Sequence, residues 1–86
     1  MDVIKKMQIK YLQSRKAELL ERLRHNEREE DKMIECNDFN GYMELHRETE
    51  ILHYRIDVIN SRIHNIQNPD KKYYVLERSF PLVTNK

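Results

Sequence analysis

The sequence predicts an all-α fold: an antiparallel two-helix hairpin with coiled-coil-like packing and an extended C-terminal tail. Three observations predict it, namely a helix-favouring composition, a long heptad pattern in the second half, and a break near mid-chain. The 86 residues include one Gly, two Pro and no Trp, and 36% of them are charged. Lys, Glu, Arg, Leu and Gln all have good helix propensity. A single domain this small buries little apolar surface, so we expect self-association or a bound partner.

The first helix is expected over residues 2–35, where neither Gly nor Pro interrupts the chain. Its apolar residues fit two periodicities. One is a heptad track that loses its apolar character after Leu23, and the other is an eleven-residue step. The heptad track consists of Ile9, Leu12, Lys16, Leu19, Leu23, Asn26, Glu30 and Met33. The eleven-residue step consists of Met1, Leu12, Leu23 and Ile34. The sequence leaves both periodicities open.

Residues 24–32 read RHNEREEDK and contain no apolar side chain. A helix over this stretch is therefore expected to lack a core face. The stretch is interpreted either as a solvated helical segment or as a polar contact surface for another protein.

The second helix is expected over about residues 40–67 and carries an unbroken heptad seam. Its members alternate at intervals of three and four: Tyr42, Leu45, Thr49, Leu52, Ile56, Ile59, Ile63 and Ile66. Such a stripe needs a covering helix, and its aliphatic members are also candidates for a self-association seam: Leu45, Leu52, Ile56, Ile59, Ile63 and Ile66. Ile51 and Val58 widen this face, which favours two hairpins joining into a dimeric four-helix bundle.

The clear break in the pattern is the stretch Asn37–Gly41. Asp38 or Asn40 can cap the second helix, and Gly41 can take conformations that are closed to other residues. Phe39 can fold back onto the hairpin as a hydrophobic staple. The hairpin is expected to span residues 1–68, because the following proline pushes residue 68 out of the α region.

Residues 69–86 form a tail that is denser in strand-favouring side chains. The tail either packs across the hairpin and completes its core, or lies extended against a partner. Four of its side chains are candidate partner contacts, because aromatic residues often anchor interfaces. They are Tyr73, Tyr74, Leu76 and Phe80.

No residue pattern indicates catalysis, a cofactor or a metal site. His46 and His53 are seven residues apart, whereas two ligands on one helix usually sit four apart. Cys36 has no Cys partner and no fixed His–acid arrangement. A two-helix hairpin encloses no pocket of enzymatic size. We therefore expect a protein that is not an enzyme and that binds no cofactor and no metal.

The charge balance and hydropathy predict a cytoplasmic protein that does not enter membranes. The net charge of +1 gives no general attraction to nucleic acid or acidic lipid. Basic residues of the first helix do not form a single stripe, which makes nucleic-acid binding a minority hypothesis. No apolar run approaches the ~18 residues of a membrane span, and the N-terminus lacks the apolar core of a secretory signal.

The favoured functional hypothesis is a small protein–protein interaction module that regulates or inhibits another protein, as phage and bacterial accessory proteins do. On the outer face of the second helix, His46, Arg47 and Tyr54 are the expected contacts, in addition to the tail. A second hypothesis is a self-associating coiled-coil structural or assembly factor. A third is a nucleic-acid-binding regulator. The motifs assign the chain to no family, and they name no partner.

Overall fold

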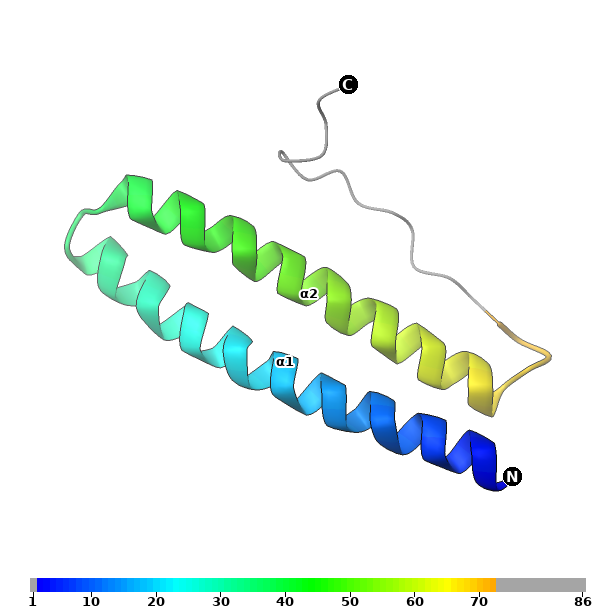
Figure 1. Cartoon of the computed structure of the whole chain (residues 1–86). Helices are drawn as coiled ribbons and strands as arrows, with labels where there is room; N and C mark the ends of the chain where they lie inside the picture. The colour runs from blue at the N-terminus through cyan, green and yellow to red at the C-terminus, as the bar shows by residue number, and fades with distance from the viewer. Residues whose placement is uncertain (1, 73–86) are drawn as a thin grey trace.

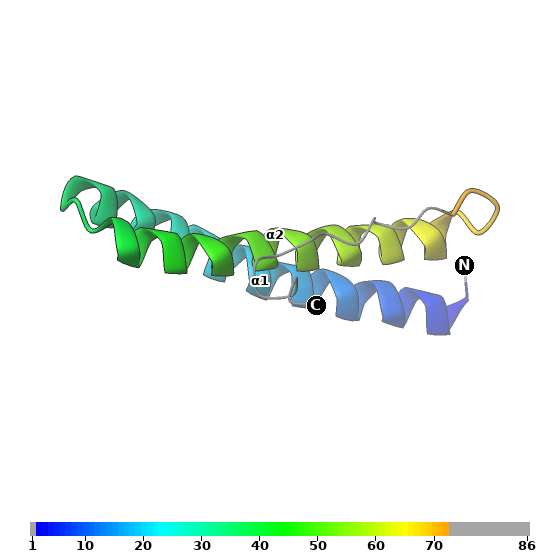
Figure 2. The same cartoon turned by 90° about the horizontal axis from the view of Figure 1, so that it is seen from above.

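The computed structural model describes residues 2–72, which form two helices, α1 (Val3–Glu35) and α2 (Phe39–Gln67). The helices run side by side in opposite directions (Figure 1). Seen from above, they cross at a shallow angle (Figure 2). This confirms the predicted all-α hairpin. The tail residues Tyr73, Tyr74, Leu76 and Phe80 lie outside the described residues.

The turn between the helices joins the C-cap of α1, Cys36, to the N-cap of α2, Asp38, through the single residue Asn37. At the end of α1, the Asn37 N–H donates to the Ile34 carbonyl at 3.1 Å, and the Asp38 N–H donates to the Met33 carbonyl at 2.8 Å. These paired bonds form a Schellman motif, which requires the left-handed backbone that Asn37 adopts with a φ of 59°. The Asp38 carboxylate then accepts from the Gly41 N–H at 3.0 Å and caps α2, which confirms the predicted cap. Such a cap typically stabilises its helix by about 1 kcal/mol.

Two details of the predicted turn are wrong. Gly41 does not use a left-handed conformation, because it already lies inside α2 and the positive φ belongs to Asn37. Its role is spatial: a Cβ at Gly41 would lie 2.5 Å from Oδ2 of Asp38 and 3.1 Å from the capping oxygen Oδ1. Phe39 does not fold back as a staple, because it is the first residue of α2 and remains 59% exposed.

The core follows the heptad track on α1 and the heptad seam on α2. Leu19 and Leu52 are almost fully enclosed, with 1% and 2% of their surfaces exposed. The buried cluster consists of Leu12, Leu19, Leu23, Leu52, Ile56 and Ile59. Ile34 is 47% exposed, so the heptad track describes α1 and the eleven-residue step does not. Burying a leucine side chain contributes about 1.5–3 kcal/mol, so this short cluster provides much of the stability.

The seam is closed in its middle and open at its ends. Thr49, Leu52, Ile56 and Ile59 are buried, whereas the outer members of the seam are half-buried. The half-buried members are Tyr42, Leu45, Ile63 and Ile66. At the end of the hairpin away from the turn, α1 therefore leaves part of the α2 seam uncovered.

The expectation that residues 24–32 lack a core face is wrong. Asn26 and Glu30 continue the heptad track as buried polar residues, and α2 supplies polar partners for them. The Asn26 amide donates to the Glu48 carboxylate at 3.1 Å, and the Thr49 hydroxyl donates to the Glu30 carboxylate. We call Asn26, Glu30, Glu48 and Thr49 the polar layer. Because buried polar groups need partners, the layer favours the register in which these side chains meet.

Candidate functional site

A groove runs between α1 and α2 at the end of the hairpin away from the turn. Two adjoining hollows of about 740 and 470 Å³ form it, and they share Tyr11, Leu12 and Arg62 in their linings. The floor consists of the seam-side residues Leu12, Leu19, Ile59 and Ile66. The walls are Ile4, Gln8, Tyr11 and Arg15 on α1, and Arg55, Val58, Arg62 and Asn65 on α2. We call this feature the open-end groove.

Helical spacing aligns each wall. The α1 wall residues follow one another at intervals of four, three and four, and the α2 wall residues at intervals of three, four and three. Each set therefore forms one stripe along its helix, beside the seam. From residue 4 to residue 15 the α1 wall covers eleven residue steps of about 1.5 Å each, or about 17 Å. The groove is thus long enough to contact about three turns of another helix.

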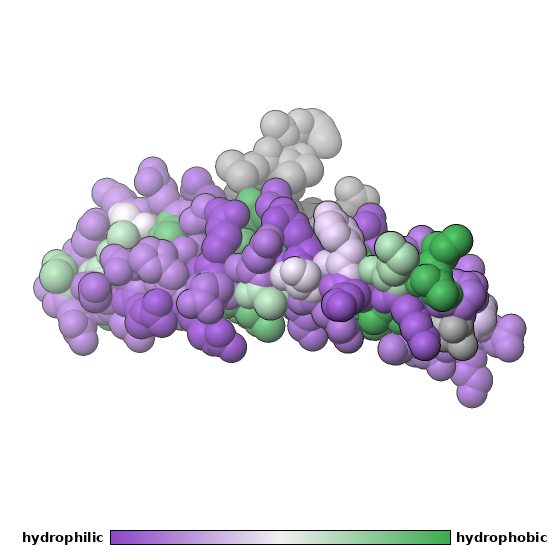
Figure 3. Space-filling model, turned by 60° about the horizontal axis from the view of Figure 1, so that its bottom comes forward, coloured by the Kyte–Doolittle hydropathy of each residue, from purple (hydrophilic) through white to green (hydrophobic). Residues whose placement is uncertain are grey.

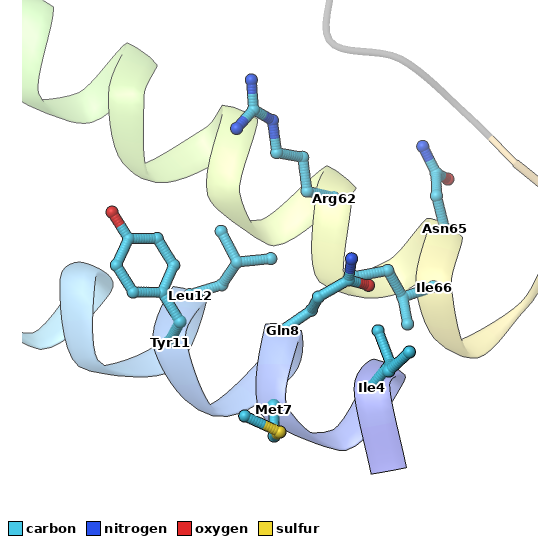
Figure 4. Close-up of a pocket in the computed structure, with 8 residues that line it drawn as sticks. All are labelled: Ile4, Met7, Gln8, Tyr11, Leu12, Arg62, Asn65 and Ile66. Atoms are coloured by element: carbon cyan, nitrogen blue, oxygen red, sulfur yellow. The ribbon is translucent and has the colours of Figure 1, made fainter. Parts of the chain in front are cut away.

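The α1 side of the groove exposes large apolar side chains. Ile4, Met7 and Tyr11 are 68%, 65% and 67% exposed. Figure 3 shows the strongest hydrophobic colouring at the open end of the hairpin, while most of the visible surface is hydrophilic. Figure 4 shows Ile4, Gln8, Leu12 and Ile66 between the two helices, and Arg62 extending over the α2 side. Clustered exposed apolar side chains with a polar border are typical of protein-interaction sites.

The charged border of the groove is basic. Nearer the turn, Arg22 of α1 pairs with Glu48 of α2 at 3.6 Å. Arg15 lies seven residues before Arg22 on α1, and Arg55 lies seven residues after Glu48 on α2, so the same antiparallel register places these two arginines opposite each other. Both line the same hollow. Arg15 pairs with Glu18 of its own helix at 3.0 Å. Across residues 2–72, no acidic side chain pairs with Arg55 or Arg62.

The structure does not bring the three predicted α2 contacts onto one outer surface. His46 lies beside the seam, stacks on Tyr42 at 5.4 Å between ring centroids, and places Nδ1 3.6 Å from Oε1 of Glu30. The prediction that His46 lies on the outer face of the second helix is therefore wrong, because its ring lies beside the polar layer. Arg47 is exposed. Tyr54 is half-buried and lines the open-end groove.

The predicted self-association seam lies within the chain's own helix pair. Leu52, Ile56 and Ile59 are buried in the packed core, and Leu45, Ile63 and Ile66 are half-buried. A second molecule therefore has to bind beside the seam rather than on its middle. The open-end groove offers such a place, because Ile59 and Ile66 reach its floor.

The sequence interpretation missed the exposed α1 residues of this groove. Ile4, Met7 and Tyr11 are apolar residues spaced three and four apart, and none belongs to the heptad track. A second apolar line beside a core track is the signal that could have found them. Arg15, Arg55 and Arg62 give no such signal, because only the pairing register reveals that they border one groove.

Among residues 2–72, no three His, Cys, Asp or Glu side chains come together as a metal site. Over the same part of the chain, neither helix has the combination of length and hydrophobicity that a membrane crossing requires. Cys36 is exposed and unpaired beside the turn, at the end of the hairpin opposite the groove.

Comparison with known proteins gives no relative for this chain. No protein-family model matches it, and no curated protein or solved structure matches it either.

Proposed function

We propose that this chain is a non-enzymatic protein–protein interaction module that regulates or inhibits the protein it binds. The observation that carries the proposal is the open-end groove, where exposed apolar side chains flank an incompletely covered seam. Removing apolar surface from water contributes about 25 cal/mol per Å² to the free energy of binding, so a partner that covers these side chains gains affinity. Occupation of this surface regulates or inhibits the partner by masking the partner's own contact segment.

Self-association is the second candidate, and the half-buried seam ends favour it. Two hairpins that place their groove faces together would cover Ile63, Ile66 and Tyr11 and form a dimeric four-helix bundle. This arrangement would make the chain a coiled-coil assembly factor. The basic border counts against it, because an isologous contact at the groove brings like charges together.

The binding proposal is tested by affinity capture with the full chain from its native host. Tyr11→Glu replaces an exposed aromatic side chain of the groove wall with a carboxylate, so the helix is retained while a bound partner loses an aromatic contact. We expect recovery of the partner to fall about tenfold or more, because aromatic residues at interface hot spots often contribute about 2 kcal/mol or more. Met43→Glu is the matched control, since Met43 is 55% exposed and lies near the turn.

The readout is mass spectrometry across a salt series. A protein that is captured by the wild type and Met43→Glu but lost with Tyr11→Glu supports the proposal. Equal loss from both variants, or equal recovery with both, contradicts it. Recovery of the bait alone, with a doubled solution mass, favours the assembly factor. Nucleic acid released steeply by salt favours the third hypothesis.

A further inference from the structure

We propose that the open-end groove accepts an amphipathic helix of a partner protein that carries acidic side chains along the edges of its apolar stripe. The inference rests on the proposed binding function and names the chemistry of the partner. Two features of the groove carry it: its apolar floor between two antiparallel helices, and its basic border.

The floor and walls fit a third helix. Helices that pack side by side have axes about 8–10 Å apart, and a helix laid over the contact line of two others touches both. Leu12, Ile59 and Ile66 give that helix apolar contacts along the floor, and Tyr11 and Val58 give it contacts on the two walls. Partner residues spaced three and four apart would fill these positions in turn, as in other helix-in-groove complexes.

The border determines the charge of that helix. Arg15 and Arg55 oppose each other across the groove, and Arg62 lies two helical turns beyond Arg55 on the same wall. Arg15 pairs with Glu18 of its own helix, and no acidic side chain of residues 2–72 forms an ion pair with Arg55 or Arg62. The hairpin therefore keeps like charges facing each other, whereas nearer the turn Arg22 meets Glu48. Carboxylates on both edges of an incoming helix would pair with both walls.

Charge disfavours two other occupants. A second copy placed groove to groove would add Arg15, Arg55 and Arg62 of one chain to those of the other. The chain's own residues 69–86 carry four basic and two acidic side chains, so the tail would also add positive charge. An acidic amphipathic helix would place apolar side chains on the floor of the groove and carboxylates beside its border arginines.

The test uses the full chain and two labelled three-heptad peptides. Both peptides have Leu at positions a and d and Ala at b, c and f. One carries Glu at e and g, and the other carries Lys there. Fluorescence anisotropy titrations give their dissociation constants at ~0.05 M and ~0.5 M salt, where the Debye length falls from about 14 Å to about 4 Å. We expect the Glu peptide to bind at least about tenfold more tightly at low salt and to lose most of this preference at high salt.

Charge reversal at the border provides the decisive variant. Arg15→Glu/Arg55→Glu should weaken binding of the Glu peptide about tenfold and strengthen binding of the Lys peptide. Arg24→Glu/Arg28→Glu is the matched control, because it reverses two exposed arginines of α1 that line neither hollow. Arg24, like Arg15, pairs with a glutamate of its own helix. Arg62→Glu is a second border variant, which tests the α2 wall without altering the opposed arginine pair. Circular dichroism confirms that each variant retains its helices.

Several results would overturn the inference. Equal affinity for both peptides would do so, and so would no binding of either peptide. A charge preference that only the Arg24→Glu/Arg28→Glu control changes would also do so. A dimer in sedimentation equilibrium that excludes both peptides would assign the groove to a second copy. If capture from the host depends on Tyr11 while the peptides show no acidic preference, the binding function stands and the charge inference fails.

Discussion

Replacing Leu52 with aspartate should leave the chain largely unfolded at room temperature. Leu52 is 2% exposed and packs in the middle of the core cluster. Truncating such a leucine alone costs about 2–5 kcal/mol, and the introduced carboxylate adds the cost of an unpaired buried charge. Small domains have total stabilities at the low end of about 5–15 kcal/mol, so the loss is expected to exceed what the hairpin holds. Far-ultraviolet circular dichroism should show the loss of helicity.

The matched control is Met43→Asp, which makes the same charge change at an exposed position of the same helix. Its effect on the free energy of unfolding should stay within about 0.5 kcal/mol, as is usual for surface substitutions. A Leu52→Asp chain that keeps the helicity and melting temperature of the wild type would show that the seam is not the core. Equal unfolding of both variants would mean that α2 tolerates no new charge, whatever its burial.

Removing one partner from the polar layer should cost more than removing both. Thr49→Val keeps the shape of the side chain but leaves the buried Glu30 carboxylate without its hydroxyl donor. The expected loss in the free energy of unfolding is about 1–3 kcal/mol. Adding Glu30→Leu removes the stranded carboxylate, and replacing buried polar pairs with apolar residues is often neutral or stabilising by about 1–4 kcal/mol. The double variant should therefore recover the stability of the wild type or exceed it.

Urea unfolding of the wild type, the two single variants and the double variant gives the coupling energy as a double-mutant cycle. Glu30→Gln is the control, because its amide oxygen can still accept the Thr49 hydrogen bond while the charge beside His46 is removed. Additive effects of the two substitutions would contradict direct coupling between Glu30 and Thr49. A double variant less stable than either single one would mean that the layer contributes net stability instead of mainly fixing the register.

The α2 part of the fold could be predicted from sequence because its apolar pattern is regular. Eight seam positions at alternating intervals of three and four define one face, and Asp38 marks where the helix starts. The same regularity was missing from α1 after Leu23. Its heptad track continues there through Asn26 and Glu30, which are buried in the structure. Their low hydropathy predicts exposed positions instead. Only the pairing with Glu48 and Thr49 makes those positions part of the interior.

The candidate site was harder to predict than the fold, because it depends on how the two helices are paired. Ile4 and Arg62 are far apart in the chain, and neither marks a site by itself. The antiparallel register brings them to one groove. The sequence predicts His46 as a contact on the outer face of the second helix, yet in the structure its ring lies beside the seam, 3.6 Å from Glu30. The surroundings of residues that flank a heptad seam can therefore be assigned only when the position of the facing helix is known.

The most direct test of the binding account is site-specific photo-crosslinking in the native host. A photoreactive phenylalanine analogue is placed at Tyr11 in one chain and at Phe39 in another. Both positions are aromatic, and they are 67% and 59% exposed at opposite ends of the hairpin. The account predicts a covalent adduct with a second protein from position 11 and none from position 39. An adduct from position 39 alone, or no adduct from position 11, would contradict it.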